Sequence, residues 1–203
     1  MAVTSEVQLC NNALLRLGTN TITSLTDGTT AANACNQAYS PTRDALLRMH
    51  LWNFAIKRTA LAADVATPSF EFNYQYTLPV DFIRVHRIYN QTSPFTIEGP
   101  KLISDQAAPL NLVYVSRITD VTKFDPIFTE ALILALMLHI GPRIQGDGYV
   151  AGDTMRQYKD MLITAQIADA QDGTPINIDA STFMDARDGG GGAWWNDLGR
   201  RYP

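Results

Sequence analysis

The feature that most constrains this chain is the stretch of residues 127–140, which is apolar at most positions. A helix that is apolar on nearly every side must be surrounded by protein, so we expect it at the centre of a helical bundle or against partner subunits. Asp125-Pro126 precedes the stretch. Proline is favourable at the first helical position, because the backbone N–H that it lacks would have no partner within the helix there. The longest unbroken apolar run, residues 131–138, is much shorter than the ~20 residues that cross a bilayer. We therefore predict a buried helix and no membrane partner.

Two amphipathic helices are predicted near the start of the chain. The first follows the capping candidate Thr4 and ends at Gly18. A turn at Asp27-Gly28 precedes the second helix, whose apolar stripe spans residues 31–49. Pro41 should kink or split this helix, because proline removes a backbone donor and clashes with the preceding turn. The apolar stripe of the first helix consists of Val7, Cys10, Leu14 and Leu17.

From Phe54 onward the pattern changes to short aromatic and β-branched segments. Around Trp52 the helix exit is expected to become a strand, with the tryptophan in the core. Ile83 and Val85 alternate with polar neighbours, which is typical of an antiparallel sheet with one solvated face. The segments of strand length are residues 70–78, 82–89, 95–97 and 110–116.

After the apolar helix the sequence predicts one more helix and then a tail. Gly141-Pro142 is expected to disturb the end of the apolar helix, and Gly146-Asp147 forms a turn. The last helix places Tyr158, Leu162 and Ala165 on one face and ends at about residue 170. Beyond it no periodicity remains.

The predicted fold class is α+β, a helical bundle with an inserted antiparallel β domain and an extended C-terminal tail. Residues 1–53 and 122–172 would form the helical bundle, and residues 54–121 the β-rich insertion. Residues 173–203 would form the tail, in which four successive glycines, 189–192, have the composition of a flexible spacer.

The charge of the chain argues against tight binding of nucleic acid. Its formal net charge is −4, whereas phosphate contacts require clustered Lys and Arg. The N-terminus lacks the basic and apolar regions of a secretory signal, and Cys10 and Cys35 lie within helical patterns. We therefore expect two buried thiols in a protein made in a reducing cytoplasm.

The sequence offers few candidates for catalysis, a metal or a cofactor. His50, His86 and His139 have no metal-ligand spacing to one another or to a cysteine. Cys35 as a nucleophile with His50 or His139 as its base is conceivable, but a small buried cysteine is far more common. No phosphate loop or dinucleotide fingerprint is present in the sequence. We therefore predict no catalytic, cofactor-binding or metal-binding residues.

A specific string of residues runs from the second helix through its exit. It consists of Cys35, Tyr39, Arg43-Asp44, Leu46-Leu47, His50 and Trp52-Asn53-Phe54-Ala55. This string resembles the tail tubular protein A family of short-tailed phages, the head-to-tail adaptors. Further matches follow in the family's order over about residues 5–172. They are Tyr76, Leu78-Pro79, Asp81, Arg84-Val85, Glu98-Gly99, Leu102, Asp105, Tyr114, Arg117, Asp120, Phe124-Asp125-Pro126, Phe128, Ala131-Leu132, Gly146-Asp147, Tyr158 and Ala168-Asp169-Ala170.

Two positions depart from the family pattern. Leu51 stands where the family usually has proline, and Pro41 falls in a helix that the family usually leaves unbroken. Both positions lie at the second helix, so the geometry of the end of this helix is the part of the family's fold that transfers least well to this chain.

The resemblance implies a virion protein without catalytic residues, present in the neck of the tail and assembled in the host cytoplasm. It would form a twelve-fold ring of its own copies on the portal protein, with the tail nozzle protein below and DNA passing through without specific binding. An acidic lumen would repel the phosphates and keep the channel slippery. Two alternatives stay open. One is a neck or completion protein of a longer-tailed phage, and the other is a cytoplasmic enzyme or ligand-binding domain with an unrecognised site.

The tail carries the predicted partner-binding residues. Apolar side chains spaced along its end would anchor it to the portal, and two arginines beside them would pair with acidic portal groups. These candidates are Trp194, Trp195, Leu198, Arg200, Arg201 and Tyr202.

Overall fold

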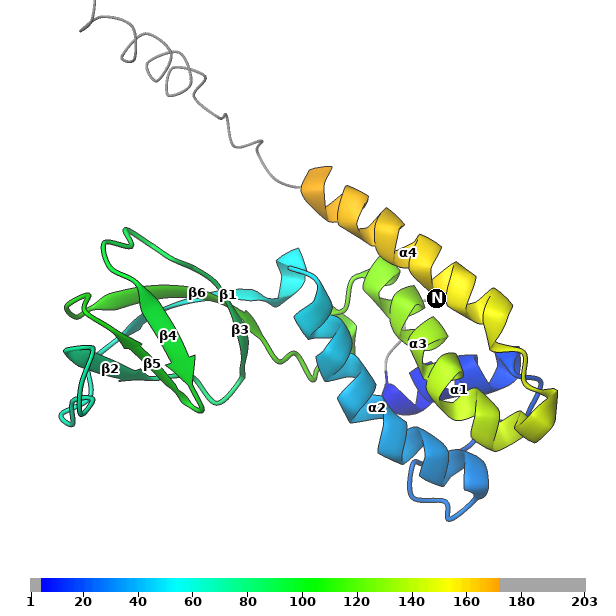
Figure 1. The fold of residues 1–203 in the computed structure, drawn as a ribbon. Helices are drawn as coiled ribbons and strands as arrows, with labels where there is room; N and C mark the ends of the chain where they lie inside the picture. Colours follow the sequence, from blue (N-terminus) through cyan, green and yellow to red (C-terminus); the bar gives the residue numbers. More distant parts are fainter. Residues whose placement is uncertain (1–4, 172–203) are drawn as a thin grey trace, which may run out of the picture. The chain divides into compact units, whose positions relative to one another are not determined.

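The computed structural model describes residues 5–171, and it has the α+β fold that the sequence predicts. Its helices are α1 (Glu6–Arg16), α2 (Thr30–Met49), α3 (Pro126–Gln145) and α4 (Ala151–Gln171). Six strands lie between α2 and α3 in the sequence and form the β-rich part, as Figure 1 shows. Short 3₁₀ turns follow α2 (Asn53–Ala55), precede α3 (Val121–Lys123) and follow α3 (Gly146–Gly148).

Helix α3 is the centre of the helical part, as its apolar sequence predicts. The Asp125 carboxylate caps it by accepting hydrogen bonds from the backbone nitrogens of Ile127 (2.7 Å) and Phe128 (3.4 Å). Both α1 and α2 pack on α3. Among the described helices, the segment Pro126–Gly148 alone is long and apolar enough to span a membrane, but 56% of its 18-residue apolar window is buried within the fold. Its composition is therefore explained by its place in the core.

The prolines inside α2 and α3 do not end these helices. Helix α2 runs without a break through Pro41, so the expectation of a split was wrong, and α3 continues past Pro142 to Gln145. Both prolines lie on the exposed side of their helices. The carbonyl that loses its partner at Pro41 belongs to exposed Gln37, where water can replace the missing donor.

The ends of α1 show one correction and one confirmation. Ser5, and not Thr4, caps the helix, since its side chain accepts from the Gln8 nitrogen at 3.2 Å. Gly18 ends the helix as predicted, with φ of +71°. Its nitrogen donates to the Leu15 carbonyl and that of Thr19 donates to the Leu14 carbonyl, which together form a Schellman motif.

The strands form two three-stranded antiparallel sheets. One has the order β1 (Ile56–Leu61), β6 (Leu110–Ser116), β3 (Phe82–Ile88), and the other has the order β2 (Tyr74–Thr77), β5 (Lys101–Ser104), β4 (Phe95–Glu98). The predicted segment 70–78 is shortened to β2. Strand β5 was not predicted, because it has four residues and is joined to β4 by the two-residue turn Gly99-Pro100. Two register shifts in β3 break the alternation expected around Ile83 and Val85.

The described residues form two apolar cores. The larger surrounds α3, and the smaller lies between the two sheets, where Tyr76 and Leu102 meet Leu110 and Leu112. Strand β3 and helix α2 connect them, since the Arg48 guanidinium donates to the Ile83 carbonyl (2.6 Å) and that of Arg84 donates to the Arg48 carbonyl (2.9 Å).

Candidate functional site

The predicted portal-binding residues Trp194, Trp195, Leu198, Arg200, Arg201 and Tyr202 lie outside the described residues, as does the whole segment 172–203. The site is therefore sought on the surfaces of the helical and β-rich parts.

The residues that carry the family resemblance in α2 make structural contacts. Buried Arg43 holds Asp44, with Nη2 2.9 Å from Oδ1, and its guanidinium lies 5.7 Å from the centroid of the Tyr39 ring. The other oxygen of Asp44 accepts from Arg117 Nε at 2.9 Å. Trp52 is buried, its Nε1 donates to the Leu46 carbonyl at 2.9 Å, and its ring packs edge-on against Phe128. These contacts therefore fix α2 and its exit to α3 and to the segment that follows β6.

A second group of these residues joins the strands around Asp81. Its carboxylate accepts from Lys57 Nζ at 2.6 Å and from Tyr114 Oη at 2.9 Å, and its carbonyl accepts from the Arg117 nitrogen at 2.6 Å. Burial tends to raise the pKa of Asp81, but the hydrogen bonds from Lys57 and Tyr114 outweigh it and lower the pKa. Asp81 is therefore an ionised structural bridge.

The cysteines and histidines do not form a nucleophile and base. Cys10 and Cys35 are both buried and free, and their thiols contact each other, which the sequence did not predict. The hydrogen bond between the two thiols raises the pKa of Cys10 together with burial and lowers the pKa of Cys35, so the case against a nucleophile and base rests on the positions of the histidines. His50 caps α2 fifteen residues after Cys35, about 22 Å along the helix. His139 is exposed, whereas Cys35 is fully buried.

Other carboxylates with a lowered pKa hold turns and loops. Asp27 accepts from the backbone of Ser24 and Thr23, and Asp120 accepts from Thr122. Asp64 accepts from Lys101 and from Thr77. Among residues 5–171, no group of three or more His, Cys, Asp or Glu side chains could hold a metal ion.

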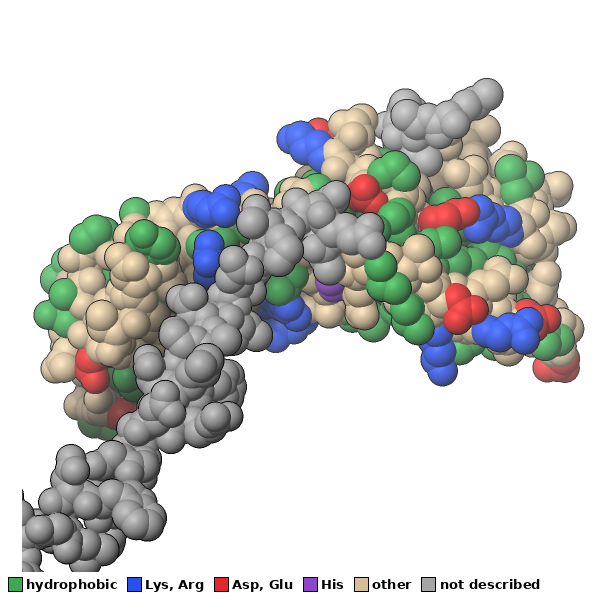
Figure 2. Space-filling view, turned by 90° about the horizontal axis from the view of Figure 1, so that it is seen from above, with side chains coloured by type: hydrophobic (Ala, Val, Ile, Leu, Met, Phe, Trp, Pro, Cys, Tyr) green, Lys and Arg blue, Asp and Glu red, His purple; other side chains and the backbone are tan. Residues whose placement is uncertain are grey.

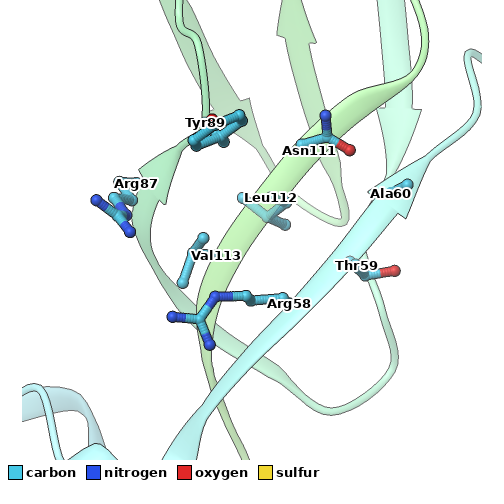
Figure 3. A pocket seen from close by; sticks show the side chains of 8 residues that line it. All are labelled: Arg58, Thr59, Ala60, Arg87, Tyr89, Asn111, Leu112 and Val113. Atoms are coloured by element: carbon cyan, nitrogen blue, oxygen red, sulfur yellow. The ribbon is translucent and has the colours of Figure 1, made fainter.

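The most distinctive surface feature is a basic groove on the outer face of the β1–β6–β3 sheet, with a volume of about 430 Å³ (Figure 3). The strand register places Arg58 of β1 and Arg87 of β3 on either side of Val113. Both guanidinium groups lie at the same end of the groove, and Tyr89 and Asn111 lie at the other end. Val113 is buried although Arg58 and Arg87 are exposed, as expected if the aliphatic stems of the arginines cover it. We refer to Arg58, Arg87, Tyr89, Asn111 and Val113 as the basic groove.

The charge of the basic groove is uncompensated among the described residues. Its lining contains no Asp or Glu, and neither arginine makes an ion pair with a described side chain. Burial and then the nearby charges of Arg87, Arg84 and Arg58 lower the pKa of His86. Figure 2 shows Lys and Arg side chains gathered on the β-rich part near the helices. This surface can bind a carboxylate or another anion.

A second groove, between α2, α3 and α4, is mainly apolar and has a volume of about 400 Å³. Met49 and Met155 border it, and Tyr158 Oη lies 3.5 Å from Met49 Sδ. It contains one histidine, His139, and no carboxylate. The residues that line this groove offer apolar contact area, but they include no pair of side chains that could act as a nucleophile and its base.

The sequence did not identify the basic groove. Its arginines are 29 positions apart, and only the pairing of β1 and β3 with the same strand brings them together. The available signal was Arg84 and His86, which alternate with apolar residues in a predicted strand and indicate a solvated face.

No protein-family model matches the chain, and no curated protein matches it.

Proposed function

We propose that this chain is a phage virion structural protein, the head-to-tail adaptor that joins the portal to the tail nozzle and continues the DNA channel. The observation that carries the proposal is the ordered series of residues shared with the tail tubular protein A family over about residues 5–172.

The contacts of these residues support a structural role. Arg43, Asp44 and Trp52 hold α2 in place, and Arg117, whose nitrogen donates to the Asp81 carbonyl, joins the β-rich part to Asp44 of the helical part. Residues kept for chemistry would instead converge on a cavity. In this chain a part of the shared pattern, Arg43, Asp44, Asp81 and Arg117, instead forms bonds within and beside the junction between the helical and β-rich parts, which suits a subunit with a fixed shape.

The described grooves give the enzymatic alternative no positive observation. An active site is expected to hold a nucleophile, base or acid at a cavity, often with a shifted pKa. In residues 5–171 the carboxylates with a lowered pKa are each accounted for by a turn, a loop or a strand junction.

The resemblance further implies the partners. Twelve copies would form a ring on the portal protein, the nozzle protein would dock below, and DNA would slide through. The net charge of −4 is consistent with a channel that does not hold DNA. The tail with Trp194 and Trp195 would be the portal-binding arm.

Imaging of a mixture with the portal protein of the same phage tests this function. Electron microscopy of the full chain with portal rings should show a second ring stacked on each portal. A chain that lacks residues 189–203 should keep its circular dichroism spectrum but bind the portal much more weakly, because the aromatic anchors are removed. Bare portal rings with the full chain would contradict the adaptor function. Undiminished binding by the truncated chain would instead assign the contact to the helical part.

A further inference from the structure

We propose that neighbouring copies of this chain bind to each other through their β-rich parts, with an acidic surface of one copy docked in the basic groove of the next. The inference rests on the proposed function, because it names the contact that would build the ring. The acidic surface consists of Phe70, Glu71 and Glu98.

The two surfaces lie on opposite outer faces of the β-rich part. Leu110, Leu112 and Tyr114 of β6 face the core between the sheets, so the alternate residues Asn111 and Val113 lie on the outer face with the basic groove.

In the second sheet, Tyr76 and Leu102 face the same core. The alternate row of this sheet, with Lys101 paired to Glu98, therefore lies on the outer face that points away from the basic groove. The two surfaces are thus placed for a head-to-tail contact.

The acidic surface has charge available for a partner. Lys101 lies beside Glu98 but binds Asp64 and donates to Thr77 Oγ1 at 2.7 Å. Neither Glu71 nor Glu98 makes an ion pair with a described side chain, and both are exposed. They border a depression of about 320 Å³ that Phe70 also lines.

An apolar anchor projects beside these two charges. The Phe70 side chain is 80% exposed, and Glu71 has a φ of +74°, a left-handed conformation that is uncommon for residues other than glycine. On the basic side, Tyr89 and the alkyl stems of the arginines offer apolar area. Each surface therefore combines charge of one sign with an apolar contact, as interface centres require.

Rings need this kind of asymmetric contact. A two-fold dimer matches a patch with itself, whereas a ring matches two different patches on each subunit. The basic groove cannot bind a second basic groove, because the like charges of four arginines would repel. The occupant we assign is therefore the acidic surface of another copy, and Arg58 and Arg87 would be covered in the ring.

Charge exchange in the full chain tests the contact. Arg58→Glu/Arg87→Glu and Glu71→Arg/Glu98→Arg should each weaken self-association at least about tenfold in sedimentation velocity, since like charges then face each other. A mixture of the two variants should recover association, because each restores the opposite charge on its partner. The chain with all four substitutions should self-associate again. The control Arg156→Glu/Lys159→Glu changes the net charge as much as the groove variant does, but on α4.

Several outcomes overturn the inference. One is a wild-type chain that stays monomeric up to its solubility limit, and another is a groove variant that self-associates as strongly as wild type. The inference also fails if the mixture of the two charge variants does not recover self-association, or if the α4 control variant self-associates as weakly as the groove variant. Circular dichroism of each variant checks that the fold is intact. Portal imaging separates the two proposals: stacked rings formed equally by wild type and Arg58→Glu/Arg87→Glu would refute this contact and leave the adaptor function standing. An absence of stacked rings with wild type would refute the adaptor function.

Discussion

The helical part and the β-rich part of this protein are held together by different means. The core around α3 contains 28 buried residues and the core between the sheets contains eight, so apolar burial stabilises the helical part far more. The β-rich part adds polar bridges, such as Asp64 with Lys101 and Thr77, and Asp81 with Lys57 and Tyr114. We therefore expect a firm helical part and a β-rich part that opens at lower free energy.

The largest effect is expected from Trp52→Ala in the helical core. The ring is buried, its N–H is bonded to Leu46, and it packs on Phe128, so its removal leaves a cavity. We expect a loss of about 3 to 5 kcal/mol in the free energy of unfolding, measured by urea denaturation. A variant as stable as wild type would mean that this ring is not part of the core.

Leu102→Ala in the core between the sheets should cost about 2 to 4 kcal/mol, because the side chain is fully buried. If the two cores differ in stability as described, the loss of stability should appear only in the sheet that contains Leu102. Amide hydrogen exchange should accelerate in β2, β5 and β4, while the protection of α3 stays as in wild type. Equal acceleration in α3 would show that the two cores unfold as one.

Two glycines near the end of the helical part should respond with opposite signs. A Cβ at Gly141 would lie 2.4 Å from the Tyr149 ring, so Gly141→Ala must displace that ring, at an expected cost of about 1 to 2 kcal/mol. Gly152 in α4 has open space around it, so Gly152→Ala should stabilise by up to about 1 kcal/mol through helix propensity. Thermal unfolding of both variants measures the difference, and equal shifts of one sign would refute the packing at Gly141.

The smallest effect concerns the polar bridge at Asp64. The hydrogen bond from Lys101 lowers the pKa of Asp64 below its ordinary value of 3.8. The folded chain therefore binds this proton more weakly than the unfolded chain. The resulting stability is present above about pH 4 and is lost as the pH falls through the folded pKa. Asp64→Asn should be less stable than wild type by under about 1 kcal/mol at neutral pH, and the gap should close on acidification. A gap that is independent of pH in urea titrations would contradict the ion pair.

The predictions from sequence succeeded where local signals decide the structure. Asp125-Pro126 marked the start of α3, Gly18 marked the end of α1, and residues 110–116 were identified as the strand that became β6. They failed at Pro41 on one point: the helix is not split there, and α2 is continuous from Thr30 to Met49 with Tyr39 and Thr42 buried beside the proline.

The candidate site was harder to predict than the fold. The basic groove and the contact of Cys10 with Cys35 depend on strand register and helix packing, which a single sequence does not specify. The predicted tail residues around Trp194 remain predictions, since they lie outside the described residues.

The central claim is that this chain forms the ring between portal and nozzle, and cryo-electron microscopy of the neck of purified virions tests it most directly. The proposal predicts a ring directly below the portal, each subunit of which fits the four helices and two sheets described above, with Arg58 and Arg87 facing Glu71 and Glu98 of the next subunit. A neck whose ring density fits another fold, or virions that contain no copy of this chain, would contradict it.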